Sequence, residues 1–305
     1  MSNRLRIRQT LVVVTLVTLV FTDARRGEPA CGPCEESESS SAAGRASDSR
    51  EPGALGVGPQ RREERGAPRA VKDDNAREIV AESQRRTDTK TQRYEGLLQV
   101  FDAKGKITDK RWTFERLGSH GASKAVLRFT APAEVKGVAL LVVNHPDRSS
   151  DQWMWIPAVE RDRRIALQDR STRFFGTDFT FEDLEERDVS QYDYTLAGDD
   201  TVDGAACWKV QSTPKETKSS QYTRSMVWIR KDHYAAARID NYVKDQVVRR
   251  LSYSRIENVQ GVWTARQLEM ADLLRGSRTR LSLEKLQYDV PLEDDGFTLQ
   301  AIRRP

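Results

Sequence analysis

The sequence predicts a mainly β protein (α+β), built on one large antiparallel sheet that is curled or closed. About a dozen segments between residues 94 and 288 alternate apolar and polar residues, and they recur about every ten to twelve residues. Turn-forming residues separate them, and the connections are too short for the crossovers that parallel strands need. Many short strands at this spacing are typical of β-sandwiches and β-barrels.

The start of the chain has the anatomy of a secretory signal peptide. Three arginines precede an apolar run at residues 11–21, and a small-x-small sequence follows and ends at Ala24. We therefore expect residues 1–24 to direct export. An uncleaved segment that serves as an anchor is the alternative.

Residues 25–72 predict a disordered linker. They are rich in Ser, Gly, Pro, Glu and Arg, so little apolar area is available to offset the entropy lost on ordering. Cys31 and Cys34 form a Cys-x-x-Cys pair here, but no second pair follows to complete a zinc site. A local disulfide or two free thiols is the favoured state. Lipidation at Cys31 stays open, although Glu28 stands where an aliphatic residue is usual.

Residues 73–305 are expected to form one domain, since no Gly/Pro/Ser-rich linker interrupts them. A helix at about residues 76–86 opens the domain, after the capping residues Asp73, Asp74 and Asn75. Strands follow, separated by turns such as the one at residues 198–200. The expected strands are residues 94–101, 107–117, 122–130, 138–143, 152–156, 163–167, 192–196, 207–211, 225–230, 235–243, 247–256, 262–271 and 279–288.

Charged residues occupy alternate positions in many of these strands, which predicts one wet and one apolar face of the sheet. A strongly curved sheet of this kind needs a cover for its apolar concave face. The helix at 76–86 and the segment at about 172–186 are the evident candidates.

Aromatic residues concentrate between residues 152 and 184, in a chain whose aromatic content is only 8%. Such a group marks either a core or a surface that holds an apolar ligand. Because neighbouring residues of a strand point to opposite faces, only one of each adjacent pair is able to face inward. The residues predicted to line or close a ligand cavity are Trp153, Trp155, Phe174, Phe175, Phe179 and Phe181, with Leu140 and Val142 from the neighbouring strand.

Motifs that carry catalysis are not evident in the sequence. His120, His145 and His233 fall in separate turns, where solvated side chains are expected, and Cys207 lies in a strand as a buried thiol. Phosphate loops, dinucleotide fingerprints and nucleophile elbows do not occur. We therefore expect a protein that is not an enzyme, with no catalytic residues, no metal and no cofactor.

Carboxylates near residue 180 are the nearest approach to a reactive cluster. Asp178 and Glu182 would share a face of a helix and suit a cation or an acid/base pair. Capping of that helix by Thr177 or Asp178, with the other acids in solvent, is the favoured explanation.

Basic residues lie close in sequence to the aromatic group, namely residues 161–164, Arg170 and Arg173. A basic rim around an apolar surface would suit an amphiphile with an anionic head, and the solvated face of a strand explains the same residues equally well. The net charge of +4 is too small to indicate nucleic acid.

Four successive motifs resemble those of the outer-membrane lipoprotein-sorting (LolA-like) family. The first is Phe129-Thr130-Ala131-Pro132 followed by Lys136-Gly137-Val138-Ala139-Leu140-Leu141, and the second is Gln152-Trp153-Met154-Trp155-Ile156-Pro157-Ala158. The third is Arg163-Arg164-Ile165, and the fourth is Phe175-Gly176-Thr177-Asp178-Phe179-Thr180-Phe181-Glu182-Asp183-Leu184. Thr177 replaces the usual Ser of the family motif and keeps its hydroxyl.

The resemblance implies a fold and a role. The fold is an unclosed, strongly curved β-barrel, and short helices cover its apolar concave face. The role is that of a periplasmic carrier of acylated lipoproteins or other lipids. Its partner would be an inner-membrane transporter or an outer-membrane acceptor. The resemblance implies no cofactor and no nucleic acid. A protein-interaction or lipid-sensor module of the cell envelope is the alternative.

Overall fold

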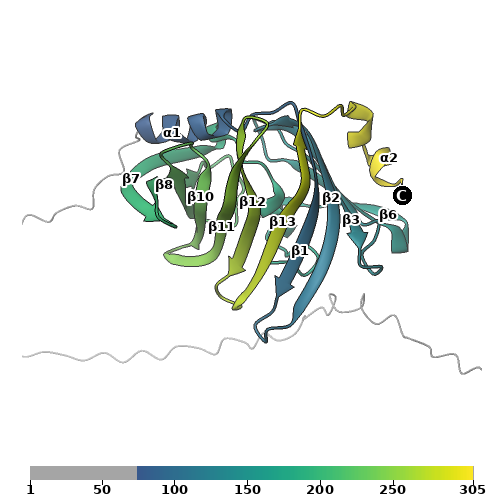
Figure 1. The fold of residues 1–305 in the computed structure, drawn as a ribbon. Coiled ribbons are helices and arrows are strands. Elements are labelled where there is room, and N and C mark those ends of the chain that lie inside the picture. The colour runs from purple at the N-terminus through teal and green to yellow at the C-terminus, as the bar shows by residue number, and fades with distance from the viewer. Residues whose placement is uncertain (1–73, 305) are drawn as a thin grey trace, which may run out of the picture. The chain divides into compact units, whose positions relative to one another are not determined.

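The computed structural model describes residues 74–304, which form one antiparallel sheet of 13 strands (Figure 1). The predicted signal peptide and linker lie outside these residues. The strand order is β6-β5-β4-β3-β2-β1-β13-β12-β11-β10-β9-β8-β7, so β13 joins the two halves by pairing with β1. The sheet is not closed, and β6 and β7 are its edges. The predicted fold class, a mainly β protein with a curved, unclosed antiparallel sheet and few helices, is confirmed.

The elements agree with the expected ones in type and order, but β6 ends three residues before the end of the expected strand at 163–167, and β7 is six residues longer than the expected strand at 192–196. The helices are α1 (Asp74–Arg85) and α2 (Leu299–Ile302). The strands are β1 (Thr91–Phe101), β2 (Ile107–Ser119), β3 (Ala122–Ala131), β4 (Ala139–Val143), β5 (Asp151–Ile156), β6 (Arg161–Arg164), β7 (Tyr192–Val202), β8 (Ala205–Pro214), β9 (Arg224–Arg230), β10 (Ala236–Val243), β11 (Gln246–Val259), β12 (Val262–Asp272) and β13 (Ser277–Tyr288).

One predicted turn, at residues 198–200, is wrong. These residues lie inside β7, which pairs with β8 as far as Val202. Gly198 sits at a register shift and has a φ of 116°, so it forms a bulge that bends the strand without ending it. Glycine marks bulges as well as turns, and the sequence did not separate the two.

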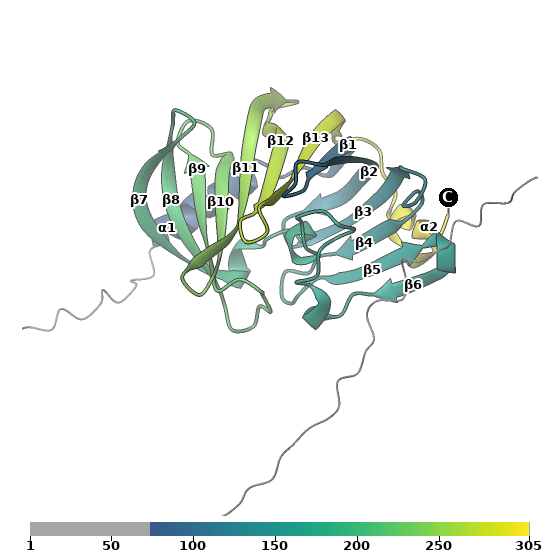
Figure 2. The same cartoon turned by 90° about the horizontal axis from the view of Figure 1, so that it is seen from below.

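The chain between the two edge strands, residues 165–191, is termed the crossover segment. It lies inside the curve of the sheet, between the two halves (Figure 2). It therefore covers the concave face, as expected for the region around 172–186. The expected capped helix is absent from residues 172–186, because the chain there forms an isolated bridge between Arg173 and Thr180 and a 3-10 turn at Glu182–Leu184.

Strand β4 is buried on both faces, as its continuous apolar run predicts. Leu140 and Val142 pack into the main core of the concave side, with Phe174 and Phe181 of the crossover segment. The other face of β4 packs against the C-terminal segment, where Leu141 contacts a cluster that includes Phe297 and Ile302. The sequence did not indicate this second cover, since a four-residue helix carries too short an apolar pattern.

Helix α1 covers the concave side over β7 and β9. Ala76 and Ile79 pack on Tyr192, Tyr194 and Ile229, which explains the thin apolar stripe of the helix. In addition, Ser83 Oγ donates a hydrogen bond of 2.7 Å to the backbone oxygen of Tyr234.

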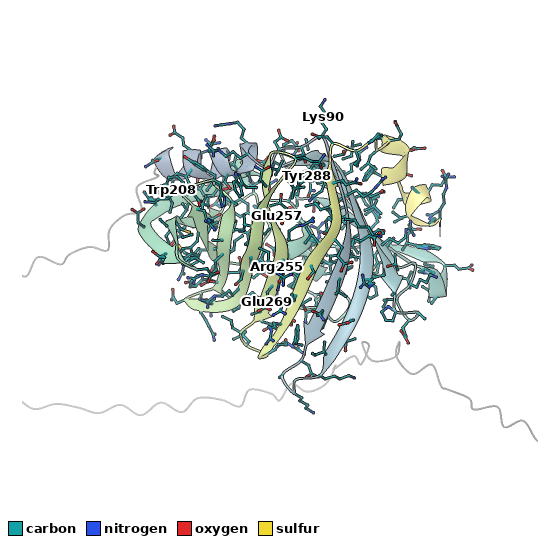
Figure 3. All side chains as sticks on the ribbon, in the orientation of Figure 1. Lys90, Trp208, Arg255, Glu257, Glu269 and Tyr288 are labelled. Atoms are coloured by element: carbon teal, nitrogen blue, oxygen red, sulfur yellow. The ribbon has the colours of Figure 1, made fainter. Side chains whose placement is uncertain are left out.

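Charged side chains cover the outer face of β11–β13, where Glu257 and Glu269 are visible in Figure 3. Glu257 pairs with Arg266 at 2.8 Å, and Glu269 pairs with Arg280 at 2.9 Å. The sheet thus has the predicted wet outer face. Among the described residues, the helices are too short or too polar to cross a bilayer.

Candidate functional site: two adjoining cavities under the crossover segment

An apolar cavity of about 200 Å³ lies between the crossover segment and the concave face. Its walls come from β1 to β4 on one side and from β11 to β13 on the other, and Phe179 and Leu184 close it. The large apolar residues that line it are Tyr94, Trp112, Phe114, Leu127, Leu140, Val142, Phe179, Leu184, Leu251, Tyr253, Leu268 and Leu281.

A second cavity, of about 420 Å³, lies between α1, the crossover segment and the strands of the second half. Four residues line both cavities, namely Asp183, Leu251, Tyr253 and Leu268, so the two spaces adjoin. Leu251, Tyr253 and Leu268 are only half-buried although they lie on the concave face, since they border this space. Together the cavities fall in the size range of small-molecule sites, roughly 300–1,000 Å³.

The acidic residues of the crossover segment bind to β2 and to the connection between β8 and β9. Glu182 accepts a 2.8 Å hydrogen bond from the backbone N–H of Gln221. Glu185 is buried and pairs with Lys218 at 2.9 Å and also with Arg170. Glu186 pairs with Arg116 of β2. The expectation that these acids are solvated is therefore wrong, because each one has a partner on another part of the chain.

Asp178 is the most deeply buried of these acids, with no exposed side-chain area. It pairs with Arg173 at 2.7 Å and accepts hydrogen bonds from Ser277 Oγ and Thr279 Oγ1 at 2.6 and 2.7 Å. Its own backbone N–H donates to Thr279 Oγ1 at 2.8 Å. Asp178 thus attaches the crossover segment to β13 and has different partners from Glu182, so the two acids do not form a pair.

Asp183 lies where the two cavities meet. It accepts hydrogen bonds from Thr180 N–H and Tyr222 OH, both of 2.8 Å, and its side chain is only 4% exposed. Burial raises the pKa of Asp183, and the hydrogen bonds and the nearby Arg249 oppose that rise.

Arg187 supplies a cation to the wall of the larger cavity. Its Nη2 donates to Asn241 Oδ1 at 3.1 Å, and its guanidinium lies 5.6 Å from the centre of the Tyr192 ring. Burial alone would lower the pKa of Arg187, but nearby Tyr192 and Asp183 raise it, so the group stays charged. The carboxylates of Glu182, Asp183, Glu185 and Glu186 line the same cavity, and each of them has a partner elsewhere on the chain.

The structure divides the predicted ligand-lining residues into three sets. Leu140, Val142 and Phe179 line the smaller cavity. Phe174 and Phe181 are buried in the core, and Phe175 packs against them. Trp153 and Trp155 lie in the cluster under the C-terminal segment, on the other face of the sheet.

An open groove of about 910 Å³ borders Trp155, beside α2. Arg128, Lys136, Arg161 and Arg303 also line it, so its walls carry four cationic side chains. Of these three hollows, the smaller cavity under the crossover segment is the most enclosed, and its lining is mostly apolar.

The predicted basic rim does not border the cavities. Arg170 is buried against Glu185 and Ser150, and Arg173 is held by Asp178. Arg163 and Arg164 pair with Asp169 and Asp151 at 2.8 and 2.6 Å. These arginines stabilise the fold of the crossover segment and of β5 and β6.

The three histidines lie in separate parts of the structure, but the expectation that they are solvated is wrong. His120 lines the larger cavity and lies 3.1 Å from Thr87 Oγ1. His145 contacts Asp151 at 3.1 Å. His233 is only 7% exposed and stacks on Trp263 with ring centres 4.5 Å apart. The prediction that Cys207 is a buried free thiol is confirmed.

Residues of the second half were missed as candidates for the site. Leu251, Tyr253 and Leu268 alternate with polar residues in their strands, which predicts that they face inward. Only the pairing of β13 with β1 brings them opposite Leu140 and Val142, and that pairing is not visible in the sequence. Within residues 74–304, His, Cys, Asp and Glu form no group of three or more placed to hold a metal ion.

Comparisons with known proteins place this arrangement among related folds. A family model for uncharacterized DUF1329-like proteins matches residues 121–304. The crystal structure of a DUF1329 family protein from Desulfovibrio piger is similar, with a TM-score of 0.72 and 29% identity over 75% of this chain and 98% of that one. The sequence matches none of the curated proteins.

Two further crystal structures share the fold. An outer membrane lipoprotein-sorting protein domain from Vibrio parahaemolyticus has a TM-score of 0.72 and 24% identity, over 76% of this chain and 99% of that one. A LolA superfamily protein from Nitrosomonas europaea has a TM-score of 0.60 and 18% identity, over 74% and 98%. The predicted resemblance to LolA-like proteins is confirmed by these folds.

Proposed function

We propose that this chain, which belongs to the DUF1329-like family of uncharacterized proteins, is a periplasmic, non-enzymatic carrier that holds acyl chains of lipoproteins or other lipids. The observation that carries the proposal is the pair of adjoining cavities between the crossover segment and the concave face, whose exposed lining is largely apolar.

Burial of an acyl chain there supplies affinity without specific polar contacts. Each methylene moved from water into an apolar cavity contributes about 0.8 kcal/mol, so a chain of several methylenes reaches useful affinity. Leu140, Val142, Phe179, Leu251 and Leu268 would contact the chain. The half-buried state of Leu251 and Leu268 supports this role, because such side chains gain from a ligand that covers them.

The polar part of the ligand would lie in the larger cavity, at Arg187. A guanidinium that lines a partly apolar space is stabilised by an anionic group placed next to it. Asn241, which accepts from Arg187, would hold the side chain in position. This arrangement favours ligands that have a carboxylate or a phosphate at one end of the chain.

The shared fold with a lipoprotein-sorting domain and with a LolA superfamily protein supports a binding role for lipids or lipoproteins in general. An inner-membrane transporter or an outer-membrane acceptor would be the partner in transfer.

Displacement of a fluorescent fatty acid tests the proposal. Leu268→Trp adds volume where the two cavities meet, so we expect at least a tenfold loss of probe affinity, while circular dichroism stays unchanged. Leu167→Trp is the matched control, because Leu167 is 48% exposed and lines neither cavity. If the unaltered protein binds no acyl probe and extracts no lipid from its native periplasm, the proposal is wrong.

A second function, that of an envelope protein-interaction or lipid-sensor module, draws on one observation. Phe174 and Phe181 fill part of the concave side with the chain's own side chains. In that case the acyl probe would bind weakly, Leu268→Trp would have no effect, and pull-down from envelope extracts would recover a protein partner.

A further inference from the structure

Three hairpin turns project where the central strands of the sheet end, at the lower side of Figure 1. They join β1 to β2, β12 to β13, and β10 to β11. The strand registers place them side by side, because Phe101 pairs with both Ile107 and Arg278, and Asp272 pairs with Ser277. The third turn follows Val243, which pairs with Gln246. These three turns are termed the hairpin rim.

The hairpin rim carries most of the large apolar side chains that the described residues expose. Ile107 is 53% exposed, Val243 40%, Leu273 45% and Leu274 61%. Only three other large apolar residues of the described chain are as exposed, and they lie in other places. Aliphatic residues gathered at the tips of neighbouring turns are unusual on a surface that faces only water.

Each turn also places a cation beside its aliphatic residue. Lys106 precedes Ile107, Arg275 follows Leu274, and Lys244 follows Val243. The turns also hold two acids: Asp102 accepts the backbone N–H groups of Lys104 and Lys106 at 2.8 and 2.9 Å, and the fully exposed Asp245 pairs with Arg224 at 3.3 Å. With Lys104, the cations of the three turns outnumber these acids. The rim therefore presents a repeated pair of one aliphatic and one cationic side chain.

We propose that the hairpin rim docks the protein on the surface of an anionic phospholipid bilayer. The aliphatic tips would enter the interface between head groups and acyl chains, and the neighbouring cations would contact the lipid phosphates. Charge complementarity selects this partner, since the cations flank every aliphatic tip. Separate projecting tips also suit a deformable surface better than a rigid protein groove.

Vesicle sedimentation tests the docking surface with the full chain. Vesicles of phosphatidylcholine and phosphatidylglycerol are compared with vesicles of phosphatidylcholine alone. We expect binding to the anionic vesicles, and at least a tenfold weaker binding for the Ile107→Ser, Leu273→Ser, Leu274→Ser variant. The control Val159→Ser, Leu167→Ser changes two equally exposed residues away from the rim and should bind as the unaltered protein does.

Further variants and measurements distinguish the contributions of the cations, of the cavity and of self-association to vesicle binding. Lys106→Glu, Lys244→Glu, Arg275→Glu should abolish the preference for phosphatidylglycerol, whereas Leu268→Trp should leave vesicle binding unchanged, because the cavity is not involved. Absence of vesicle binding, or equal binding by the rim variants, would overturn the proposal. So would a dimer in sedimentation equilibrium that the serine variant dissociates, because the rim would then be a contact between copies.

Discussion

Phe174 of the crossover segment stacks on Phe129 of β3, with ring centres 5.5 Å apart and planes inclined by 20°. Phe174 is completely buried, and Phe175, Phe181 and Trp112 surround it. This contact explains why the crossover segment stays on the concave face although it holds no helix. It also places Phe174 in the core of the concave side.

Removal of this side chain should destabilise the fold. Phe174→Ala leaves a cavity in the core, and we expect a loss of about 3–5 kcal/mol in the free energy of unfolding. Urea denaturation measures it. Phe175→Ala is the control at the neighbouring position, where the half-buried ring should cost less. Equal losses for both variants would show that Phe174 is not the principal contact.

The fold was more predictable than the site. Alternation located the strands because one face of the sheet is wet, as Arg278, Arg280 and Glu269 show on neighbouring strands. Alternation also implied that Trp153 and Trp155 share a face, but it did not say which. The face that the two side chains occupy depends on which other parts of the chain cover each face of the sheet. Trp153 and Trp155 lie on the outer face, where they pack in the cluster around Phe297.

The attachment of the crossover segment to β13 gives a second prediction. Asp178→Ala removes the carboxylate that pairs with Arg173 and that accepts hydrogen bonds from the hydroxyls of Ser277 and Thr279. Breaking a buried ion pair from one side costs about 3–5 kcal/mol, which chemical denaturation should detect. Glu134→Ala, at an exposed position, is the control and should change stability by less than about 0.5 kcal/mol. A small effect at Asp178 would mean that the segment has other sufficient anchors.

Asp151 predicts how stability depends on pH. Burial would raise the pKa of this carboxyl, but hydrogen bonds from Arg148, Arg164 and His145 outweigh burial and hold it well below 3.8, the ordinary value. Below that value the unfolded chain takes up the proton before the folded one does. The contribution of Asp151 to stability is therefore present above about pH 4 and is lost as the pH falls further.

Thermal unfolding at pH 6 and pH 3 checks this dependence. The unaltered protein should lose more stability between the two values than Asp151→Asn, which has no carboxyl to protonate. A variant with the same pH dependence as the unaltered protein would contradict the assignment. Glu134→Gln, at an exposed position, is expected to behave as the unaltered protein does.

Arg187 gives the sharpest test of how a ligand is oriented in the cavities. If its guanidinium pairs with an anionic head, Arg187→Met should weaken binding of a fatty acid about tenfold or more, since an ion pair at a partly buried site is lost. The methyl ester of the same fatty acid has no charge to pair, so its affinity should change little. Arg187→Lys keeps the cation without the planar fork and should recover part of the difference. Isothermal titration with the fatty acid and with its methyl ester measures the two affinities.

A variant whose affinities for the acid and for the ester fall equally would show that Arg187 shapes the cavity and does not select the head group. Only a charge contact distinguishes the two ligands.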